Sequence, residues 1–289
     1  MPRVLIAGFG YVGIATAKVF LDAGWEVEGW TSSRASAETF KETPFVVKAV
    51  DITDSSAVRA SASAADGVIQ CVSSGGGTAD AYRQIYLAGA QNLAAAFPAT
   101  PLLFTSSTSV YGQTSGEWVT EESAAVPPRE TGAVLRETEK FVLARGGTVV
   151  RLAGIYGPGR CALLRKFMAG TAVLDGLGDR FINQAHRDDI ASALFHLLQP
   201  DCAAARGGEI FNVADGEPLT ERECYAWLSQ HLNRPMPLPA SGAIVRKRGN
   251  SNKRVSSRKL QSLGWTPRFC DFRMGMEASV LAELDRAGA

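Results

Sequence analysis

The sequence has little of what metalloproteins, disulfide-stapled domains and membrane proteins need. Its 289 residues include five cysteines and three histidines, with no Cys-x-x-Cys pair and no His-Glu-x-x-His motif. We therefore expect no zinc site or other metal, and scattered cysteines of odd number suit a reducing cytoplasm. No uncharged apolar run approaches the ~20 residues that cross a bilayer, and the start MPRVLIAGFG leaves no room for a signal peptide. These absences predict a cytoplasmic protein with no membrane partner.

An excess of charge of one sign is also missing. The chain carries 30 Lys and Arg against 29 Asp and Glu, a net charge of +1, so bulk electrostatics gives no reason to expect a nucleic-acid partner. Hydrophobic residues make up 46% and charged residues 20% of the chain, which is typical of a globular protein with a sizeable core. The length favours one large domain with a smaller lobe.

The sequence does have a series of short β-rich runs separated by segments with helical spacing. The runs are residues 3–8, 26–30, 45–50, 67–72, 101–107 and 148–154. Strands that alternate with helices predict parallel pairing, and continuous apolar strands indicate a sheet covered on both faces. After about residue 154, glycine and proline punctuate the chain, which favours a smaller lobe built mostly from loops and helices. A basic stretch at 246–254 precedes an expected short helix.

The glycine run GFGYVG, residues 8–13, directly follows the first strand and opens a helix. In this context Gly8 permits a tight turn, Gly10 leaves space for a pyrophosphate, and Gly13 lets the helix pack closely on the strand. The N-terminus of the helix would add N–H groups and a positive dipole end for the phosphates. The run therefore predicts a dinucleotide site, with a purely structural strand–turn–helix as the alternative.

The residues after the second strand indicate which dinucleotide binds. An NAD site usually has Asp or Glu there for the ribose hydroxyls, whereas residues 31–34 read Thr-Ser-Ser-Arg. Hydroxyls followed by Arg34 suit a 2′-phosphate, so the sequence favours NADP(H) over NAD(H); a serine-rich loop with a solvated Arg is the alternative. After the third strand, Asp51 is expected to contact the adenine, or else Asp51 or Asp54 caps a helix.

Four further segments resemble the extended short-chain dehydrogenases/reductases, the superfamily of sugar-nucleotide epimerases and dehydratases. FTSSTSVYG (104–112) resembles the Ser-Ser-x-x-Val-Tyr-Gly signature, and RLAGIYGPG (151–159) matches an Arg-x-x-x-x-Tyr-Gly-Pro turn. INQAHRDDIASAL (182–194) and NKRVSS (252–257) are similar to later segments of the family. The matches follow the family order over nearly the whole chain. With Ala7 in place of the first glycine of the commoner pattern, the glycine run is similar to that of an atypical branch, the YeeZ-like bacterial proteins.

The resemblance implies an α/β fold, a Rossmann doubly wound parallel sheet with a smaller C-terminal substrate lobe. The implied division is a dinucleotide-binding domain from residues 1–153 with 188–213, and a substrate-binding lobe from 154–187 with 214–289. Family members are often dimers through two helices that flank the sheet. A homodimer through the segments near 80–96 and 132–145 is therefore expected.

The predicted binding residues follow from the glycine turn, the strand ends and the resemblance. The cofactor set is Gly8, Gly10, Tyr11, Val12, Gly13, Ser32, Ser33, Arg34, Asp51, Ile52, Val72 and Ser73. The resemblance implies a small-molecule substrate, often anionic in the family, and the substrate set is Tyr156, Arg160, His186, Lys253 and Arg254. For His186 and Asp189, the alternative is a structural role in which they tie the two lobes together. For the basic residues of 246–254, the alternative is a solvated loop.

The chemistry of the family depends on a serine and on a Tyr-x-x-x-Lys pair. Ser107 stands at the position of the serine that binds substrate, with capping of its own loop as the alternative. Gly132 and Glu139 match residues that flank the Tyr and Lys in the family, so Thr131 occupies the tyrosine position and Leu135 the lysine position. A phenol has a reference pKa of ~10 that a nearby ammonium lowers. Threonine has no comparable acidity, and Leu135 removes the cation.

Other ionisable side chains could supply a proton instead. Tyr111 is a tentative catalytic residue, with packing beneath its loop as the alternative, and Glu130 is a further candidate. Two functions follow: an NADP-dependent oxidoreductase or epimerase-like enzyme with a non-standard proton donor, or a dinucleotide-binding sensor that catalyses nothing fast. The missing pair argues against a true sugar-nucleotide epimerase, because loss of a positioned acid–base group typically costs ~10²–10⁴-fold in rate.

Overall fold

The chain, as a computed structural model, is described over residues 1–199, 201–202, 207–242 and 251–283. Its contacts divide it into two compact units. The first unit comprises Met1–Val110, Ala125–Arg151 and Ile190–Phe211, and the second comprises Tyr111–Ala124, Leu152–Asp189 and Asn212–Ala289. The segment Tyr111–Ala124 belongs by its contacts to the second unit, whereas the boundaries expected from the sequence include it in the dinucleotide-binding domain. Residues 246–250 of the basic stretch lie outside the described residues.

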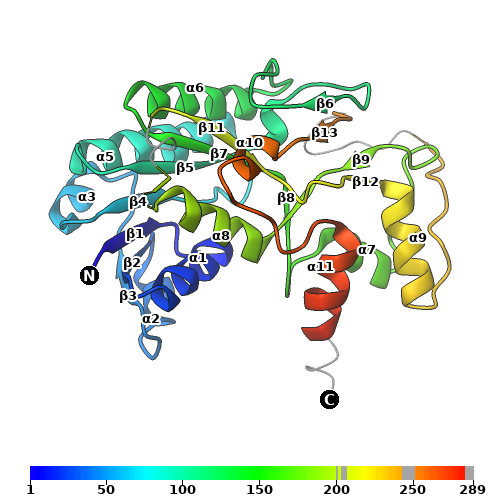
Figure 1. The fold of residues 1–289 in the computed structure, drawn as a ribbon, viewed down its shortest axis with the longest axis horizontal. Coiled ribbons are helices and arrows are strands. Elements are labelled where there is room, and N and C mark those ends of the chain that lie inside the picture. Colours follow the sequence, from blue (N-terminus) through cyan, green and yellow to red (C-terminus); the bar gives the residue numbers. More distant parts are fainter. Residues whose placement is uncertain (200, 203–206, 243–250, 284–289) are drawn as a thin grey trace. The chain divides into compact units, whose positions relative to one another are not determined.

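The first unit is built on a seven-stranded sheet with the order β11-β7-β5-β4-β1-β2-β3 (Figure 1). The strands are β1 (Arg3–Ala7), β2 (Glu26–Thr31), β3 (Val46–Ala49), β4 (Gly67–Gln70), β5 (Leu102–Ser107), β7 (Thr148–Leu152) and β11 (Ile210–Val213). β1 pairs in parallel with β2 and with β4, and the pairs β2–β3 and β4–β5 are also parallel. The chain reverses its direction of travel across the sheet at β1, where doubly wound sheets bind their ligands.

Helices cover both faces of this sheet (Figure 1). They are α1 (Tyr11–Asp22), α2 (Arg34–Glu38), α3 (Ser55–Ser61), α4 (Ala79–Tyr82), the π-helix η1 (Arg83–Ala88), α5 (Gly89–Ala96), the 3₁₀ turn η2 (Thr108–Val110), α6 (Glu130–Ala144) and α8 (Arg187–Leu197). α1 and α8 lie on one face, where Phe20 and Phe195 meet edge to face at 5.0 Å, and α3, α5 and α6 lie on the other. The predicted Rossmann fold is confirmed.

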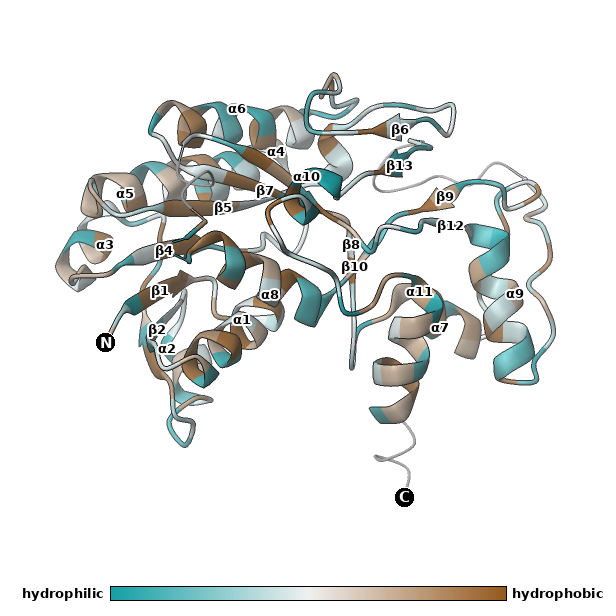
Figure 2. Cartoon of the chain, in the orientation of Figure 1, coloured by the Kyte–Doolittle hydropathy of each residue, from teal (hydrophilic) through white to brown (hydrophobic). Residues whose placement is uncertain are grey.

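The central strands are apolar on both sides, as a sheet between two helical layers requires. Val4, Leu5 and Ile6 are consecutive in β1, and their exposed fractions are 0%, 3% and 0%. Figure 2 shows hydrophobic colour along most of β1 and along the first part of β5. The continuous apolar runs of the sequence therefore correspond to strands with no solvent face.

The second unit combines three two-stranded sheets with helices. β8 (Gly154–Tyr156) pairs with β10 (Gln184–His186), β9 (Phe181–Ile182) with β12 (Leu219–Thr220), and β6 (Trp118–Val119) with β13 (Arg254–Val255). The helices are α7 (Ala162–Met168), α9 (Glu221–His231), α10 (Arg258–Gln261), α11 (Phe272–Gly275) and the π-helix η4 (Met276–Leu281). Tyr156, Phe167, Tyr225 and Phe272 are buried together in one core cluster. A capping box between Thr220 and Glu223 fixes the start of α9.

Candidate functional site

The turn from β1 into α1 has the geometry expected of a dinucleotide site. Gly8 has φ +104°, and a Cβ there would lie 2.5 Å from the Val72 nitrogen. A Cβ at Gly13 would lie 2.3 Å from the Gly8 carbonyl oxygen, so glycine is what lets the helix approach the strand. A Cβ at Gly10 would meet no atom within 4 Å. The space beside Gly10 is therefore open, while the positions on either side are closed by backbone.

The amino end of α1 faces this open space without a side-chain cap. Gly10 is the N-cap residue and has no side chain to cap the helix, and Val12 of the first turn is buried. Phe9 anchors the turn: a Cβ at Gly29 of β2 would lie 2.2 Å from its ring, and the ring meets Phe40 edge to face at 5.0 Å. Uncapped N–H groups and the positive end of the helix dipole suit a phosphate at this point.

The end of β2 presents hydroxyl and guanidinium groups in place of a carboxylate. Ser33 is the N-cap of α2 and accepts a hydrogen bond from the Ser36 nitrogen at 3.2 Å. Ser32 and Arg34 are exposed, and Arg34 makes no ion pair with any residue that the structure describes. Helix capping thus accounts for Ser33, and the guanidinium of Arg34 is available to bind an anion.

Glu28 of β2 makes its contacts with neighbouring residues of the sheet rather than at the expected cofactor site. Glu28 is 2% exposed and its carboxylate accepts from the Trp30 indole at 2.7 Å. Ion pairs with Arg3 and with Lys48, the latter at 2.9 Å, neutralise it. Three residues of β2 follow it before the strand ends, so its carboxylate does not take the place of the acidic residue of an NAD site.

The turn after β3 resolves the two roles considered for Asp51. Its side chain accepts from the Thr53 nitrogen and hydroxyl, both at 2.9 Å, and forms an Asx turn. Asp54 is the residue that caps α3. Ile52 is 6% exposed, and its side chain packs on Gly89. The helix-capping alternative is therefore right for Asp54 and wrong for Asp51, which remains exposed at the strand end.

The loop after β4 lies against the glycine turn. The Cys71 thiol donates to the Gly8 carbonyl at 3.2 Å, and burial raises the pKa of this thiol to about 12. Val72 follows, with its nitrogen beside Gly8, and the Ser73 hydroxyl accepts from the Gly75 nitrogen at 3.3 Å. The structure thus brings Val72 to Gly8, while Cys71 stays a thiol at neutral pH.

The end of β5 and the start of α6 carry the expected catalytic positions. The Ser107 hydroxyl accepts from the Ser109 nitrogen at 3.2 Å, so it caps its own loop while its O–H proton can still be donated. Thr131 is half-buried in the first turn of α6, and its hydroxyl bonds to no described residue. Leu135, one turn later, is 5% exposed. The Leu135 side chain is therefore part of the apolar contact surface of the helix.

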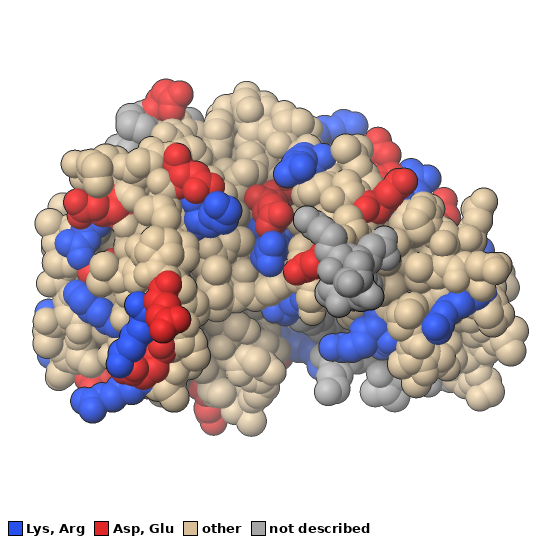
Figure 3. All heavy atoms as spheres, turned by 90° about the horizontal axis from the view of Figure 1, so that it is seen from below, with Lys and Arg blue, Asp and Glu red and all other residues tan. Residues whose placement is uncertain are grey.

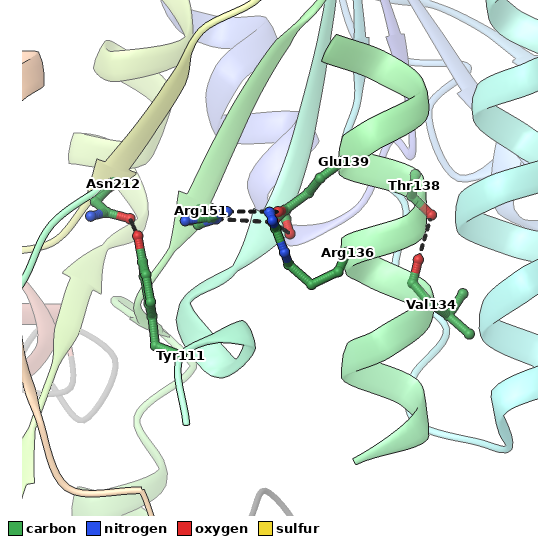
Figure 4. A network of polar contacts seen from close by, with 8 residues as sticks. Tyr111, Val134, Arg136, Thr138, Glu139, Arg151 and Asn212 are labelled. Carbon is green, nitrogen blue, oxygen red and sulfur yellow. Dashed lines mark hydrogen bonds and ion pairs between the residues drawn. The ribbon is translucent and has the colours of Figure 1, made fainter. Parts of the chain in front are cut away.

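The residues that flank these positions are held by tight packing and a buried ion pair. A Cβ at Gly132 would lie 2.5 Å from Pro127. Glu139 is 0% exposed; it binds the Arg151 guanidinium at 3.0 and 2.8 Å, pairs with Arg136, and accepts from the Ser106 hydroxyl at 2.6 Å. Figure 4 shows Arg136, Glu139 and Arg151 converging between α6 and β7. This network fixes the rotation of α6 on the sheet.

The Tyr111 side chain is buried and hydrogen-bonded within the second unit. It is 0% exposed, and its hydroxyl donates to the Asn212 amide oxygen at 3.0 Å (Figure 4). Asn212 in turn donates from its backbone to Glu121 at 2.7 Å and from its amide to the Ser256 carbonyl at 3.2 Å. In this structure the Tyr111 phenol is a buried hydrogen-bond donor to a side chain of its own unit.

Two of the predicted substrate residues are in the interior of the second unit. Tyr156 is 1% exposed and its hydroxyl donates to the Asp271 carbonyl at 3.4 Å; burial raises its pKa. His186 is 0% exposed, lies beside Ser279 at 3.1 Å and accepts from the Asp188 nitrogen at 3.2 Å. Burial lowers the pKa of His186 to about 4, so the ring is neutral. Both side chains are buried and have hydrogen-bond partners within the second unit.

The Asp189 carboxylate binds backbone groups of its own unit. Its carboxylate accepts from the Arg268 nitrogen at 2.7 Å and from the Phe269 nitrogen at 3.1 Å. Burial raises its pKa to about 6. The carboxylate therefore holds a loop of the second unit in place.

The cationic members of the substrate set differ in their surroundings. Arg160 is exposed in a turn closed by paired backbone bonds with Gly157. The Arg254 guanidinium lies 5.2 Å from the centre of the Trp118 ring and 4.9 Å from that of Phe181, and it donates to the Gly116 carbonyl at 2.8 Å. Lys253 is 6% exposed. Arg254 is thus largely committed to aromatic stacking.

The surface charge in Figure 3 and the described cavity give little further information about the site. In Figure 3, acidic and basic side chains are interspersed on the face shown, with no broad patch of one sign. A cavity of about 230 Å³ lies at the amino ends of β5 and β7, lined among others by Thr100, Arg145 and Thr148, which is the sheet edge opposite the glycine turn. Among the described residues, no group of side chains could hold a metal ion, and no helix is both long and apolar enough to cross a membrane.

A family model with the description "NAD dependent epimerase/dehydratase family" matches residues 4–214. The chain belongs to this family. The protein YeeZ of Escherichia coli K12 is 32% identical over 224 residues, 74% of this chain and 77% of YeeZ. This confirms the resemblance to the YeeZ-like branch.

Solved structures agree with this assignment. A Methylobacillus flagellatus protein provisionally described as an NAD-dependent epimerase/dehydratase has a TM-score of 0.80 at 26% identity, over 98% of this chain and 99% of its own. DesIV, the dTDP-glucose 4,6-dehydratase of Streptomyces venezuelae with NAD and TYD bound, has a TM-score of 0.81 at 20% identity, over 99% and 98%. At that identity, the likeness to DesIV concerns the fold.

The first unit fits the nicotinamide dinucleotide that the family name implies. The open space at Gly10 is the part of the site that a pyrophosphate would fill, and the closed positions at Gly8 and Gly13 form its walls. The uncapped start of α1 supplies donors there. Among the described residues, no atom lies within 4 Å of a Cβ built at Gly10, so the turn has room for a ligand.

Two buried polar residues, Gln70 and Asp215, were not expected from the sequence. Gln70 at the end of β4 donates to the Ile85 and Tyr86 carbonyls of the π-helix η1 at 3.3 and 3.0 Å. Asp215 is 3% exposed, and its Oδ1 atom finds no hydrogen-bond partner among the described residues. The sequence signal for Gln70 was a polar residue inside an apolar strand; for Asp215 we find none.

Proposed function

We propose that this protein binds NADP(H) in its first unit and is an atypical member of its family, with slow or altered acid–base chemistry on a small, anionic substrate. The preference for NADP(H) is supported by Arg34, which is exposed at the end of β2 and makes no ion pair with a described residue. The only acid of β2 beyond its first residue is Glu28, which is buried and already neutralised.

The observation that carries the proposal is the environment of Leu135. In the register set by Gly132 and Glu139, this position is that of the family lysine, and here an apolar side chain is 5% exposed. Gly132 is enforced by Pro127 and Glu139 by its ion pair with Arg151, so both flanking residues have physical reasons to be conserved in kind.

The residues that would hold the cofactor follow from the geometry. Gly10 and the start of α1 would bind the pyrophosphate, Ser32 and Arg34 the 2′-phosphate, and Asp51 the adenine side. When bound, the dinucleotide supplies hydride donor or acceptor chemistry. Ser107 can still donate its hydroxyl proton to a substrate oxygen, but threonine at 131 offers no acid of suitable pKa. Substrate would be positioned, and proton transfer would be slow.

A dinucleotide-binding sensor remains the second candidate function. It is favoured by the same loss of acid and cation, because binding needs only the glycine turn and strand ends. A homodimer through η1, α5 and α6 is also proposed; within this layer Arg83 of η1 and Glu137 of α6 form an ion pair at 3.2 Å. We place the protein in the cytoplasm because its five cysteines are scattered and form no disulfide among the described residues.

Calorimetric titration with NADPH and with NADH tests the proposal. We expect NADPH to bind at least tenfold more tightly, equivalent to about 1.4 kcal/mol, because Arg34 meets the 2′-phosphate. Equal affinities, or tighter binding of NADH, would reject the assignment of Arg34. Absence of binding to either dinucleotide would reject the proposed function as a whole.

A further inference from the structure

Lys253 is the one charged side chain of the predicted substrate set that is buried. It is 6% exposed, and its ammonium donates to the Ser251 hydroxyl at 3.0 Å. It forms no ion pair with a carboxylate of any described residue. Buried ammonium groups are ordinarily paired, because desolvation of an isolated charge is costly. The absence of a partner acid among the described residues therefore needs an explanation.

The surroundings of Lys253 favour the neutral amine. Desolvation and the nearby cation Arg180 lower the pKa of Lys253 to about 8, against a weaker opposing effect of Glu117. Arg180 itself lies 3.8 Å from a carboxylate oxygen of Glu221. Desolvation together with a neighbouring cation is the arrangement that activates nucleophilic lysines.

Hydrogen bonds hold the backbone that carries the Lys253 side chain. The Asn183 amide donates to the Lys253 carbonyl at 2.8 Å, and the Asn183 oxygen accepts from the Val255 nitrogen at 2.6 Å. The following residue, Arg254, donates from its nitrogen to the Glu117 carbonyl at 2.8 Å. These contacts, all within the second unit, fix the backbone at Lys253 and at the two residues that follow it.

We propose that Lys253 is a nucleophilic amine that condenses with small anionic carbonyl compounds, with Arg180 attracting the anionic group. The neutral Nζ attacks the carbonyl carbon and forms a C–N bond. The carbonyl oxygen takes up two protons and leaves as water, and a C=N imine remains on Lys253. No oxidant or reductant is consumed. This reaction would take place in the second unit, and it does not depend on which dinucleotide the first unit binds.

Reductive trapping tests the proposal on the full-length protein. Glyoxylate, a small anionic aldehyde, is added at pH 8 with cyanoborohydride, which reduces an imine to a stable secondary amine, and modified peptides are quantified by mass spectrometry. At pH 8 about half of Lys253 would be neutral, against roughly one in two hundred for an ordinary lysine. We expect modification of Lys253 to exceed that of Lys18, an exposed lysine with 72% of its side chain accessible, at least tenfold.

Two variants sharpen the result. Lys253→Arg keeps the charge and should abolish the modified peptide, whereas Arg180→Met should raise the pH at which Lys253 is half-modified and Arg180→Lys should not. Modification of Lys253 no faster than that of Lys18, or a pH midpoint near 10 in the unaltered protein, would overturn the proposal. Dinucleotide calorimetry reports on the first unit alone, so failure of the amine site and failure of NADP(H) binding are separate outcomes.

Discussion

Substitution at Gly10 separates a ligand-binding turn from a structural one. A Cβ at this residue meets nothing within 4 Å, and its backbone φ of −112° is open to any L-residue. Gly10→Val should therefore leave the free energy of unfolding unchanged within about 1 kcal/mol. The branched side chain would occupy the space proposed for the pyrophosphate, so dinucleotide affinity should fall at least a hundredfold, or about 2.7 kcal/mol.

Gly13→Ala is the matched control for this substitution. Its Cβ would lie 2.3 Å from the Gly8 carbonyl oxygen, a backbone atom that cannot move without shifting β1. We expect a loss of about 1–3 kcal/mol in the free energy of unfolding. Urea unfolding followed by tryptophan fluorescence gives the stabilities, and calorimetry with NADPH gives the affinities. Undiminished binding in a folded Gly10→Val protein would refute the reasoning and leave GFGYVG a structural turn.

Two further substitutions test the cofactor edge and the buried acid. Arg34→Asp should reverse the dinucleotide preference in calorimetry, because a carboxylate repels the 2′-phosphate and accepts from a free ribose hydroxyl; an unchanged preference would count against the Arg34 assignment. Burial first, and then Asp271, raise the pKa of Asp215, so its folded form keeps a proton that the unfolded chain releases, and stability falls as pH rises above about 4. Asp215→Asn should raise the free energy of unfolding by about 1–3 kcal/mol at pH 8 and leave it nearly unchanged at pH 4; a gain equal at both pH values would contradict this account.

The sheet could be predicted from the sequence because its signal is local and continuous. The run around Val4, Leu5 and Ile6 is apolar without alternation, and only a strand covered on both faces buries every residue. The glycine turn was equally readable, since the three glycines have three different physical reasons, and each reason is visible as a close or an open Cβ position.

The candidate site was harder to predict where burial decides the role of a side chain. Tyr111 and His186 lie in motifs that resemble functional segments, yet both are 0% exposed. Their hydrogen-bond partners, Asn212 and Ser279, are 101 and 93 residues away in the chain, so no local pattern could reveal them. The reduced charge of Lys253 likewise arises from burial and from Arg180, which is distant in sequence.

The central claim, that the cofactor site persists while the acid–base pair on α6 is gone, is tested most directly by turnover in the unaltered protein and in Thr131→Ala. Rates are measured at pH 7 with NADP(H) and with UDP-glucose or dTDP-glucose, at dinucleotide concentrations shown by calorimetry to saturate the site. The account predicts little turnover in the unaltered protein and no further loss in the variant. Vigorous turnover that Thr131→Ala destroys would make Thr131 catalytic and contradict the account.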